Sequence, residues 1–429
     1  MKVLVTGATG LIGQSVCARL AADGHVVVGA SRSRHPSRFG AVSQWVRVDF
    51  GQAGTPEAWL PHLHGIDAVV NCVGVLQDNA REDTAAAHAS GAAALFRACA
   101  ASGVRRVVHF SAIGVDRHQA SAFSASKIEG DRALMALDLD WVILRPSVVL
   151  GGPVFGASAL IRGLAALPVL PVMPDTGPLQ VVALEDVAET VALLVRPDSP
   201  ARVALELAGP ERLSFAEVVA LHRAWLGWRP ARPLALPGWA AGLLYRLGDL
   251  AGLLGWRPPL RSTARREIRH GAVGDPEPWT RITGIRPRSL AESLRLRPAT
   301  VQDRWFAGLY CIKPVLFVVL VLFWMLTAVI SLTTGFGNGL ELMHRAQTGA
   351  LAGPGVVAGA LADGAIGLAI AWRPTARRGL WAAIALSCFY IVTGTLLLPE
   401  LWNEPLGPLL KIWPILVAHF VALAILDER

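Results

Sequence analysis

An apolar strand at the start of the chain runs directly into a glycine-rich turn, Val3-Leu-Val-Thr-Gly-Ala-Thr-Gly-Leu-Ile-Gly13. The three glycines have no Cβ, so the turn can be tight, a phosphate can approach the backbone, and the next helix can lie close to the strand. A helix over residues 11–22 would present free N–H groups and the positive end of its dipole to that phosphate. Because a second β-branched run follows at residues 26–31, the pattern predicts a βαβ unit that binds a dinucleotide.

Short β-branched runs alternate with helical stretches over the first 150 or so residues. This alternation is typical of a doubly wound α/β sheet of the Rossmann type, with parallel strands and helices on both faces. The predicted strands are residues 2–6, 26–31, 45–49, 68–74, 106–111 and 141–145. We expect the nucleotide-binding domain to cover residues 1–227, with substrate-side elements from about residue 151.

The last third of the chain is strongly apolar. Hydrophobic residues make up 53% of the sequence and the mean hydropathy is +0.45, which is too apolar for a wholly soluble chain. Segments long enough to cross a bilayer, which takes roughly 20 residues, are residues 314–332, 349–372, 380–399 and 406–426. They predict an all-α domain over residues 305–429 that forms a four-helix transmembrane bundle.

Loop charges predict how this domain is oriented. Residues 373–378 form a basic loop and residues 399–404 an acidic one, so the positive-inside rule places the first in the cytoplasm and the second outside. The apolar run after Met1 is too short for a signal-peptide core. We therefore expect a multi-pass protein of the inner, cytoplasmic membrane with its amino-terminal domain and its carboxyl terminus in the cytoplasm.

The charge and the cysteine content limit which partners and metal sites can be expected. The net charge is +8, but the arginines crowd residues 257–288 and 373–378 beside the apolar segments. This placement indicates attraction to the anionic lipids of the bilayer, and no nucleic acid is expected as a partner. The five cysteines have no C-x-x-C spacing, so they predict neither a disulfide framework nor a metal site.

Two other features leave alternatives open. Asp363 and His419 lie at similar depths in the predicted spans, and they form either a helix-packing contact or the polar path of a carrier. Residues 228–304 are rich in Pro, Trp and Arg. This segment is either a buried substrate-side element or an amphipathic one in the bilayer interface, and in the second case the nucleotide site would open towards a lipid-soluble ligand.

Several motifs together resemble the extended or atypical short-chain dehydrogenase/reductases over about residues 1–300. They are Thr6-Gly-Ala-Thr-Gly-Leu-Ile-Gly13, Asp49, Asn71-Cys-Val-Gly74, Ser111 and Leu144-Arg-Pro146. Within that superfamily the chain is most similar to members related to the accessory nucleotide-binding subunit of respiratory complex I. Residues 305–429, above all Pro405-Leu-Gly-Pro-Leu-Leu-Lys-Ile-Trp-Pro414, resemble the DoxX-like membrane domains. That resemblance implies a connection with quinone-linked oxidation and with partners in a redox complex.

The resemblance and the strand ends together give a set of expected cofactor contacts. Asp49 would accept from the adenine amino group, Gly74 would let the backbone pass the ribose, and Lys127 would hold ribose hydroxyls. Arg32 follows the second strand, in a segment without a carboxylate, which favours NADP over NAD. The expected cofactor-binding residues are Thr6, Gly7, Thr9, Gly10, Leu11, Ile12, Gly13, Arg32, Asp49, Phe50, Asn71, Val73, Gly74, Lys127 and Pro146.

One catalytic group of the superfamily is missing. The superfamily uses a Tyr-x-x-x-Lys pair on one helix face, but Phe123 stands four residues before Lys127. The chain has only three tyrosines, Tyr245, Tyr310 and Tyr390, and none is near enough in sequence to substitute. Ser111 and Lys127 remain as the candidate catalytic residues. Lys127 alone would ordinarily be a solvated surface lysine, but its register with Ser111 favours a place in the site.

These observations support a membrane-anchored NAD(P)-binding protein that is an oxidoreductase or a component of a redox complex. Two alternatives remain: a catalytically inactive nucleotide-binding scaffold or sensor, and a nucleotide-regulated membrane carrier. Phe123 favours the scaffold, whereas Ser111 and Lys127 favour an enzyme.

Overall fold

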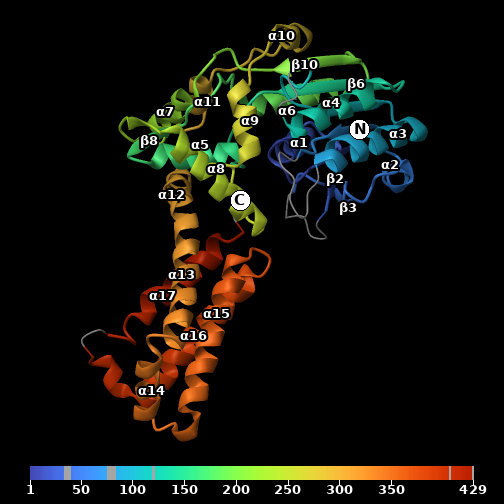
Figure 1. Cartoon of the computed structure of the whole chain (residues 1–429). Helices are drawn as coiled ribbons and strands as arrows, with labels where there is room; N and C mark the ends of the chain where they lie inside the picture. Colours follow the sequence, from blue (N-terminus) through green and yellow to red (C-terminus); the bar gives the residue numbers. More distant parts are fainter. Residues whose placement is uncertain (33–39, 75–83, 118–120, 405–406, 428–429) are drawn as a thin grey trace. The chain divides into compact units, whose positions relative to one another are not determined.

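The computed structural model describes residues 1–32, 40–74, 84–117, 121–404 and 407–427 (Figure 1). The chain forms two compact units. The first, the head, consists of Met1–Asp249 and Pro258–Ala307, and the second, the membrane unit, of Leu250–Arg257 and Gly308–Arg429. The head is therefore discontinuous in sequence.

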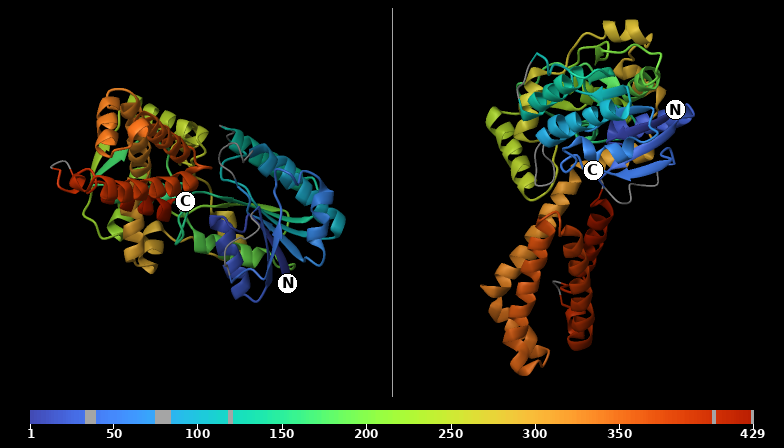
Figure 2. Two further views of the ribbon diagram at one scale, coloured as in Figure 1. Left: turned by 90° about the horizontal axis from the view of Figure 1, so that it is seen from below. Right: turned by 90° about the vertical axis from the view of Figure 1, so that its right-hand side faces the viewer.

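The head is built on a seven-stranded sheet in the order β10-β6-β5-β4-β1-β2-β3, and all of its strand pairs are parallel. Figure 2 shows the ribbon of the chain from two further sides. The strands are β1 (Lys2–Thr6), β2 (Val26–Ser31), β3 (Gln44–Arg47), β4 (Ala68–Asn71), β5 (Arg106–Phe110), β6 (Asp140–Pro146) and β10 (Val203–Leu207). A parallel sheet of this order places the carboxyl ends of β1, β4 and β5 side by side. The doubly wound α/β prediction is confirmed.

Helices cover both faces of this sheet. On one face, Val16 and Leu20 of α1 (Leu11–Ala22) and Val187 of α6 (Leu184–Leu194) pack with Val3 and Val5 of β1. On the other face, residues of α3 (Gly91–Ser102) and α4 (Ala122–Met135) pack with β4 and β5. Smaller elements of this part are η1 (Pro56–Ala58), α2 (Leu60–Leu63) and η2 (Ala86–Ser90). Continuous apolar strands such as Ala68-Val-Val-Asn71 are typical of a sheet buried on both sides.

The six predicted strands are present, with shifts of up to three residues at their ends, but β10 was not predicted. Its sequence Val203-Ala-Leu-Glu-Leu207 contains strong helix formers. Pairing with β6 fixes it as a strand, and this partner is about 60 residues away in sequence, so local propensity could not reveal it.

A second core lies in the part of the head that follows β6. Its apolar residues include Leu150, Ile161, Leu170, Val218 and Leu226. The elements here are β7 (Val149–Leu150), α5 (Ala157–Ala166), β8 (Val169–Val172), β9 (Val182–Ala183), α7 (Phe215–Trp225), β11 (Arg232–Ala235), α8 (Gly238–Leu253), α9 (Ser262–His270), α10 (Glu277–Thr283), α11 (Leu290–Leu296) and α12 (Val301–Tyr310).

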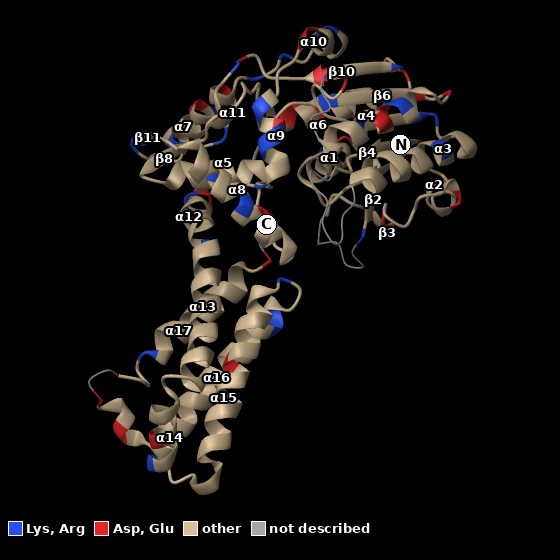
Figure 3. Ribbon diagram, viewed as in Figure 1, with Lys and Arg blue, Asp and Glu red and all other residues tan. Residues whose placement is uncertain are grey.

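The membrane unit is all helical. Its elements are α13 (Ile312–Leu332), α14 (Phe336–Arg345), η3 (Gly349–Leu351), α15 (Ala352–Ala371), α16 (Ala376–Leu397), η4 (Pro399–Trp402) and α17 (Ile412–Ile425). Among the described residues, three helical segments are long and apolar enough to cross a membrane: Ile312–Leu332, Gly349–Ala371 and Ala376–Leu397. Figure 3 shows that the ribbons of these helices carry very few charged residues.

The fourth predicted span is shorter than expected. It forms α17, which has 14 residues and is therefore about 21 Å long, less than the hydrocarbon core of about 30 Å. Contacts on either side of α17 show where its ends lie. The backbone oxygen of Leu426, directly after α17, accepts from Arg373 Nη2 at 3.1 Å, so this end of α17 lies beside the loop between α15 and α16. Before α17 in the sequence, Glu400 of η4 pairs with Arg345 of α14 at 3.2 Å.

Candidate dinucleotide site

The glycine-rich turn has the shape that a phosphate site needs. Gly7 adopts φ +66°, and a Cβ on Gly13 would lie 2.1 Å from the Gly7 oxygen. Gly10, the N-cap of α1, is extended and provides no side-chain hydrogen bond to the helix. Because Leu11 and Ile12 then begin α1, their free N–H groups remain available to an anion. The predicted turn is therefore present, and Thr9 supports it by accepting from Gln14 Nε2 at 3.0 Å.

Polar side chains join the carboxyl ends of the central strands. Thr6 Oγ1 donates to Asn71 Oδ1 at 2.7 Å, and the backbone N–H of Val73 donates to the same oxygen at 3.2 Å. Asn71 Nδ2 lies 3.1 Å from His109 Nδ1, which must accept because the amide nitrogen can only donate. Thr6 and Asn71 thus shape the sheet edge on which a ligand would rest, and His109 is a buried core residue whose pKa burial keeps well below its ordinary value.

The other predicted cofactor residues differ in their surroundings. Asp49 follows β3, and its Oδ1 accepts from the Gly51 N–H at 3.1 Å. Phe50 is a core side chain whose ring packs edge-on against Trp59 with centroids 4.9 Å apart. Arg32 is exposed directly after β2, whereas the nearby Arg34 and Arg38 lie outside the described residues. Pro146 ends β6 and is buried.

Lys127 is not a surface lysine. It is 3% exposed, and its Nζ donates to the backbone oxygens of Val73 at 3.0 Å and Phe110 at 2.8 Å. Removal from water lowers the pKa of Lys127 to about 8. An ammonium has three N–H donors, so two of them fasten α4 to β4 and β5. A Cβ on Gly74 would lie 3.9 Å from this nitrogen, which places Gly74 beside it.

Phe123 stands one turn before Lys127 on α4, at the position of the missing tyrosine. Its ring meets His88 of η2 edge-on, with centroids 5.4 Å apart. Burial lowers the pKa of His88 to about 2, and its Nδ1 lies 3.0 Å from Ser126 Oγ. A neutral, hydrogen-bonded imidazole is a poor acid, so His88 does not replace the phenol.

The Ser111 side chain is buried and bonds to other buried groups. Its Oγ donates to Asp131 Oδ2 at 3.0 Å, and the same oxygen accepts from Arg145 Nε at 3.2 Å and Nη2 at 3.0 Å. Asp116 binds the remaining arm of Arg145 at 2.5 Å. Burial raises the pKa of Asp131 and Arg145 opposes this effect. Ser111 therefore belongs to a buried ionic cluster, and its proton is donated to Asp131.

The sequence did not reveal these partners. Asp131 could have been found from its position one helical turn after Lys127, because residues i and i+4 share a helix face. Glu267 of α9 gave no local signal. Its Oε1 accepts from Ser121 Oγ at 2.5 Å and Ser124 Oγ at 3.1 Å, which puts a carboxylate at the amino-terminal end of α4.

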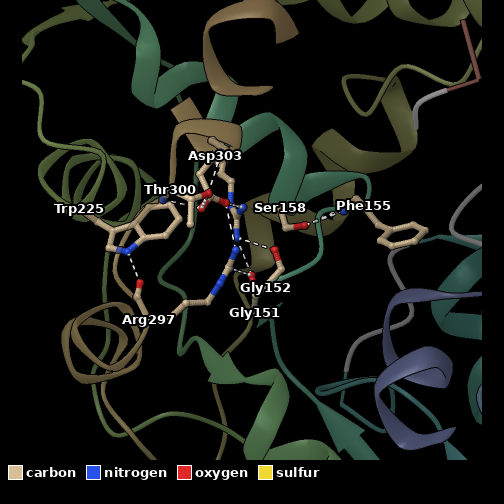
Figure 4. Close-up of polar contacts among 9 residues, drawn as sticks. Gly151, Gly152, Phe155, Ser158, Trp225, Arg297, Thr300 and Asp303 are labelled. Carbon is tan, nitrogen blue, oxygen red and sulfur yellow. Dashed lines mark hydrogen bonds and ion pairs between the residues drawn. The ribbon is translucent and has the colours of Figure 1, made fainter. Parts of the chain in front are cut away.

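A second buried ionic cluster lies in the later part of the head (Figure 4). Asp303 Oδ1 accepts from Arg162 Nη1 at 2.8 Å and Arg297 Nη2 at 3.0 Å. Thr300 donates to Asp303 Oδ2 from its N–H at 2.9 Å and its hydroxyl at 2.8 Å. The Trp225 ring lies 5.1 Å from the Arg162 guanidinium and 5.7 Å from that of Arg297. This cluster fixes the start of α12.

Arg162 also reaches the loop after β7. Its Nη2 donates to the backbone oxygens of Gly151 at 2.6 Å and Gly152 at 3.0 Å. The buried guanidinium therefore connects this loop to α12, which no sequence pattern indicated.

Asp363 and His419 of the membrane unit bond to different partners. Tyr390 donates its hydroxyl to Asp363 Oδ1 at 3.3 Å. His419 accepts from Trp324 Nε1 at its Nε2, at 2.9 Å, and its Nδ1 lies 2.7 Å from the Ile415 oxygen. Because a carbonyl can only accept, His419 is the neutral Nδ1-protonated tautomer with both nitrogens satisfied. This favours the packing alternative over a polar path. No group of three or more potential metal ligands occurs among the described residues.

Comparison with known proteins identifies both units. Residues 7–195 match the NAD(P)H-binding family, and residues 321–420 match the DoxX-like family. The chain thus combines an NAD(P)-binding domain with a DoxX-like membrane domain.

Similar proteins have diverse descriptions. An uncharacterized protein of Mycobacterium tuberculosis is 29% identical over 237 residues, 55% of this chain but only 24% of that protein. The 40 kDa subunit of NADH-ubiquinone oxidoreductase from Neurospora crassa is 26% identical over 67% of this chain and 76% of its own. The structure of MoeE5 with UDP-glucuronic acid and NAD matches 69% of this chain and 97% of that chain, with a TM-score of 0.52 and 20% identity. The last likeness confirms the fold.

Proposed function

We propose that this protein is a membrane-anchored, NADP(H)-binding component of a redox system, which holds the dinucleotide without performing the usual carbonyl reduction of its superfamily. The observation that carries the proposal is Phe123. Reduction of a carbonyl transfers hydride to carbon and requires a proton for oxygen, and a phenyl ring has none to give. The loss of a general acid typically costs about 10²–10⁴ in rate.

The surrounding groups support this proposal. Ser111 donates its proton to Asp131 rather than outward, and His88 is neutral and engaged with Ser126. In contrast, two features support dinucleotide binding: the open N-terminus of α1 and the buried ammonium of Lys127. The similarity to a subunit of NADH-ubiquinone oxidoreductase agrees with a role as a component of a larger redox assembly. A quinone or another lipid-soluble partner remains a prediction from the DoxX-like resemblance.

Arg32 supports the preference for NADP. It is exposed at the end of β2, where superfamily members recognise the ribose 2′ position, and a guanidinium there would pair with a 2′-phosphate. Titration of the full chain in nanodiscs with NADPH and NADH, followed by nucleotide fluorescence, tests this. Arg32→Ala should weaken NADPH binding and leave NADH binding unchanged, with Arg19→Ala, whose side chain is 38% exposed, as control. Equal affinity of the native protein for both nucleotides would refute the preference.

The proposed absence of carbonyl reduction is tested by the Phe123→Tyr variant, with Phe123→Leu as the matched control. The native protein and the leucine variant should oxidise NADPH negligibly with generic ketones and aldehydes. The tyrosine variant should keep nucleotide binding and gain weak turnover, because Lys127 would lower the pKa of the new phenol. Rapid reduction by the native protein and by Phe123→Leu would overturn the proposal.

The proposed orientation is a cytoplasmic head. The basic Arg373–Arg378 loop supports a cytoplasmic location for that end of the membrane unit. The bond between Arg373 and the Leu426 oxygen brings the end of α17 to the same loop, which supports a cytoplasmic carboxyl terminus.

A further inference from the structure

Helix α8 carries an uncovered apolar row. Four residues of α8 and Leu254, the residue directly after it, recur at helical spacing. These residues and their exposed fractions are Trp239 (76%), Leu243 (50%), Leu247 (51%), Leu250 (55%) and Leu254 (40%). An apolar row exposed to water lowers the solubility of a protein and usually marks an interaction surface. Leu253 continues the exposed surface at 81%.

The opposite face of α8 is occupied by its own chain. Ala241, Tyr245 and Gly248 are buried, and a Cβ on Gly248 would lie 1.7 Å from the backbone oxygen of Leu260. The Arg265 guanidinium lies 5.7 Å from the Tyr245 ring. α8 therefore cannot turn its leucines inward without losing this packing.

The last turn of α8 and the residues after it, Leu250–Arg257, belong to the membrane unit itself. The N–H of Arg373 donates to the Leu254 oxygen at 3.0 Å, and Trp256 Nε1 donates to the Ala371 oxygen at 2.8 Å. The Trp256 ring packs against Phe317 with centroids 4.8 Å apart. Since Ala371 is the last residue of α15, α8 ends at the boundary of the apolar spans. Tryptophan is enriched at this depth of a bilayer.

The charge of α9 and the length of α8 both indicate that the bilayer surface covers the apolar row of α8. α9 follows α8 and contains the exposed Arg266 and Arg269, which suit anionic headgroups. The one acidic side chain of α9, Glu267, is engaged with Ser121 and Ser124. With 16 residues, α8 is about 24 Å long, too short to cross and long enough to lie in the interface.

We propose that α8 lies in the interfacial layer of the membrane, with the row from Trp239 to Leu254 embedded in lipid and the arginines of α9 beside anionic headgroups. This surface would attach the head to the bilayer in addition to the spans. The inference concerns the lipid partner and does not depend on the proposed nucleotide chemistry.

The test uses the full chain in nanodiscs that contain phosphatidylcholine and phosphatidylglycerol, with Cys311→Ser and Cys388→Ser as background. A bimane label is attached at Leu247→Cys, at Val318→Cys as the lipid reference, and at Glu129→Cys as the aqueous reference. Val318 is 57% exposed on a predicted span, and Glu129 is exposed on α4 of the head. Quenching by brominated lipid and by iodide is then compared.

Leu247 should be quenched by brominated lipid as Val318 is, and its quenching by iodide should be several-fold weaker than that of Glu129. A Leu247 site that behaves like Glu129 would overturn the proposal. Protection from iodide without lipid quenching, found only in discs with two copies, would also overturn it and assign the row to a second chain. The double substitution Arg266→Gln and Arg269→Gln should reduce lipid quenching at Leu247 in these discs but not in pure phosphatidylcholine. No reduction would refute the headgroup role.

Discussion

Replacing Asp303 by asparagine should destabilise the head far more than replacing an exposed carboxylate. The Asp303 and Arg162 side chains are 6% and 5% exposed, so the substitution leaves a buried guanidinium without its counter-charge. Removing one partner of a buried ion pair typically costs about 3–5 kcal/mol. The carbonyls of Gly151 and Gly152 still accept from Arg162, and Arg297 is 40% exposed, so we expect the lower end of that range.

Pulse proteolysis in urea, applied to the full chain in detergent micelles, measures this loss. The free energy of unfolding of small proteins falls by about 1–3 kcal/mol per molar urea, and by somewhat more for a domain of this size. The urea midpoint of the Asp303→Asn variant should therefore lie roughly 1–2 M below that of the native protein. The matched control is Asp138→Asn, because Asp138 pairs with arginines at the surface and its side chain is 78% exposed. Exposed pairs contribute about 0–1 kcal/mol.

A double substitution that removes both charges should cost less stability than the single one. Arg162→Met with Asp303→Leu removes both buried charges, so it should be less destabilising than Asp303→Asn alone. A midpoint shift for Asp303→Asn no larger than that of Asp138→Asn would refute the argument. A double variant that loses as much as the two single variants added together would refute it as well.

Three further predictions concern binding, pH and topology. Gly13→Val should abolish nucleotide binding in the fluorescence titration, because a Cβ there would lie 2.1 Å from a carbonyl oxygen of the turn, whereas Gly54→Ala, with no atom within 4 Å, should bind normally. Burial lowers the pKa of His222 from 6.5 to about 4, so the stability that its neutral form provides is complete above pH 6.5 and falls by about 3 kcal/mol as the pH drops to 4. The urea midpoint of the His222→Phe variant should therefore depend less on acid pH than that of the native protein. The same pH profile for both proteins would contradict this prediction. Alkaline phosphatase fused after Asn403 should be active and the same enzyme fused after Arg429 inactive, and the reverse pattern would overturn the proposed topology.

Local patterns were sufficient for the elements that bind phosphate and for the class of the fold. The turn from Gly7 to Gly13 depends on residues adjacent in sequence, and alternating apolar runs mark strands buried on both faces. Length and hydropathy likewise marked the apolar helices. Their lengths were less predictable, since the fourth segment forms a helix of only 14 residues, although it lies where a span was expected.

The buried ionic clusters could not be predicted in this way. Arg162 and Asp303 are separated by 141 positions in the sequence. Each side chain alone resembles an ordinary surface charge, and only the folded arrangement brings the partners together and removes them from water. The same reason explains Lys127, whose burial became visible only with the carbonyls of Val73 and Phe110 beside it.

The discontinuous course of the chain limits how the head can be separated from the membrane. The chain passes between the two units three times, after Asp249, after Arg257 and after Ala307. A protease cut after Ala307 would leave the head attached, because the segment from Leu250 to Arg257 stays packed in the membrane unit through Trp256. A truncated head that ends there would instead carry this apolar segment into water. Releasing the head thus requires two more cuts than a simple tether would need, and these leave it as two chain fragments, or else Trp256 must be extracted from its contacts.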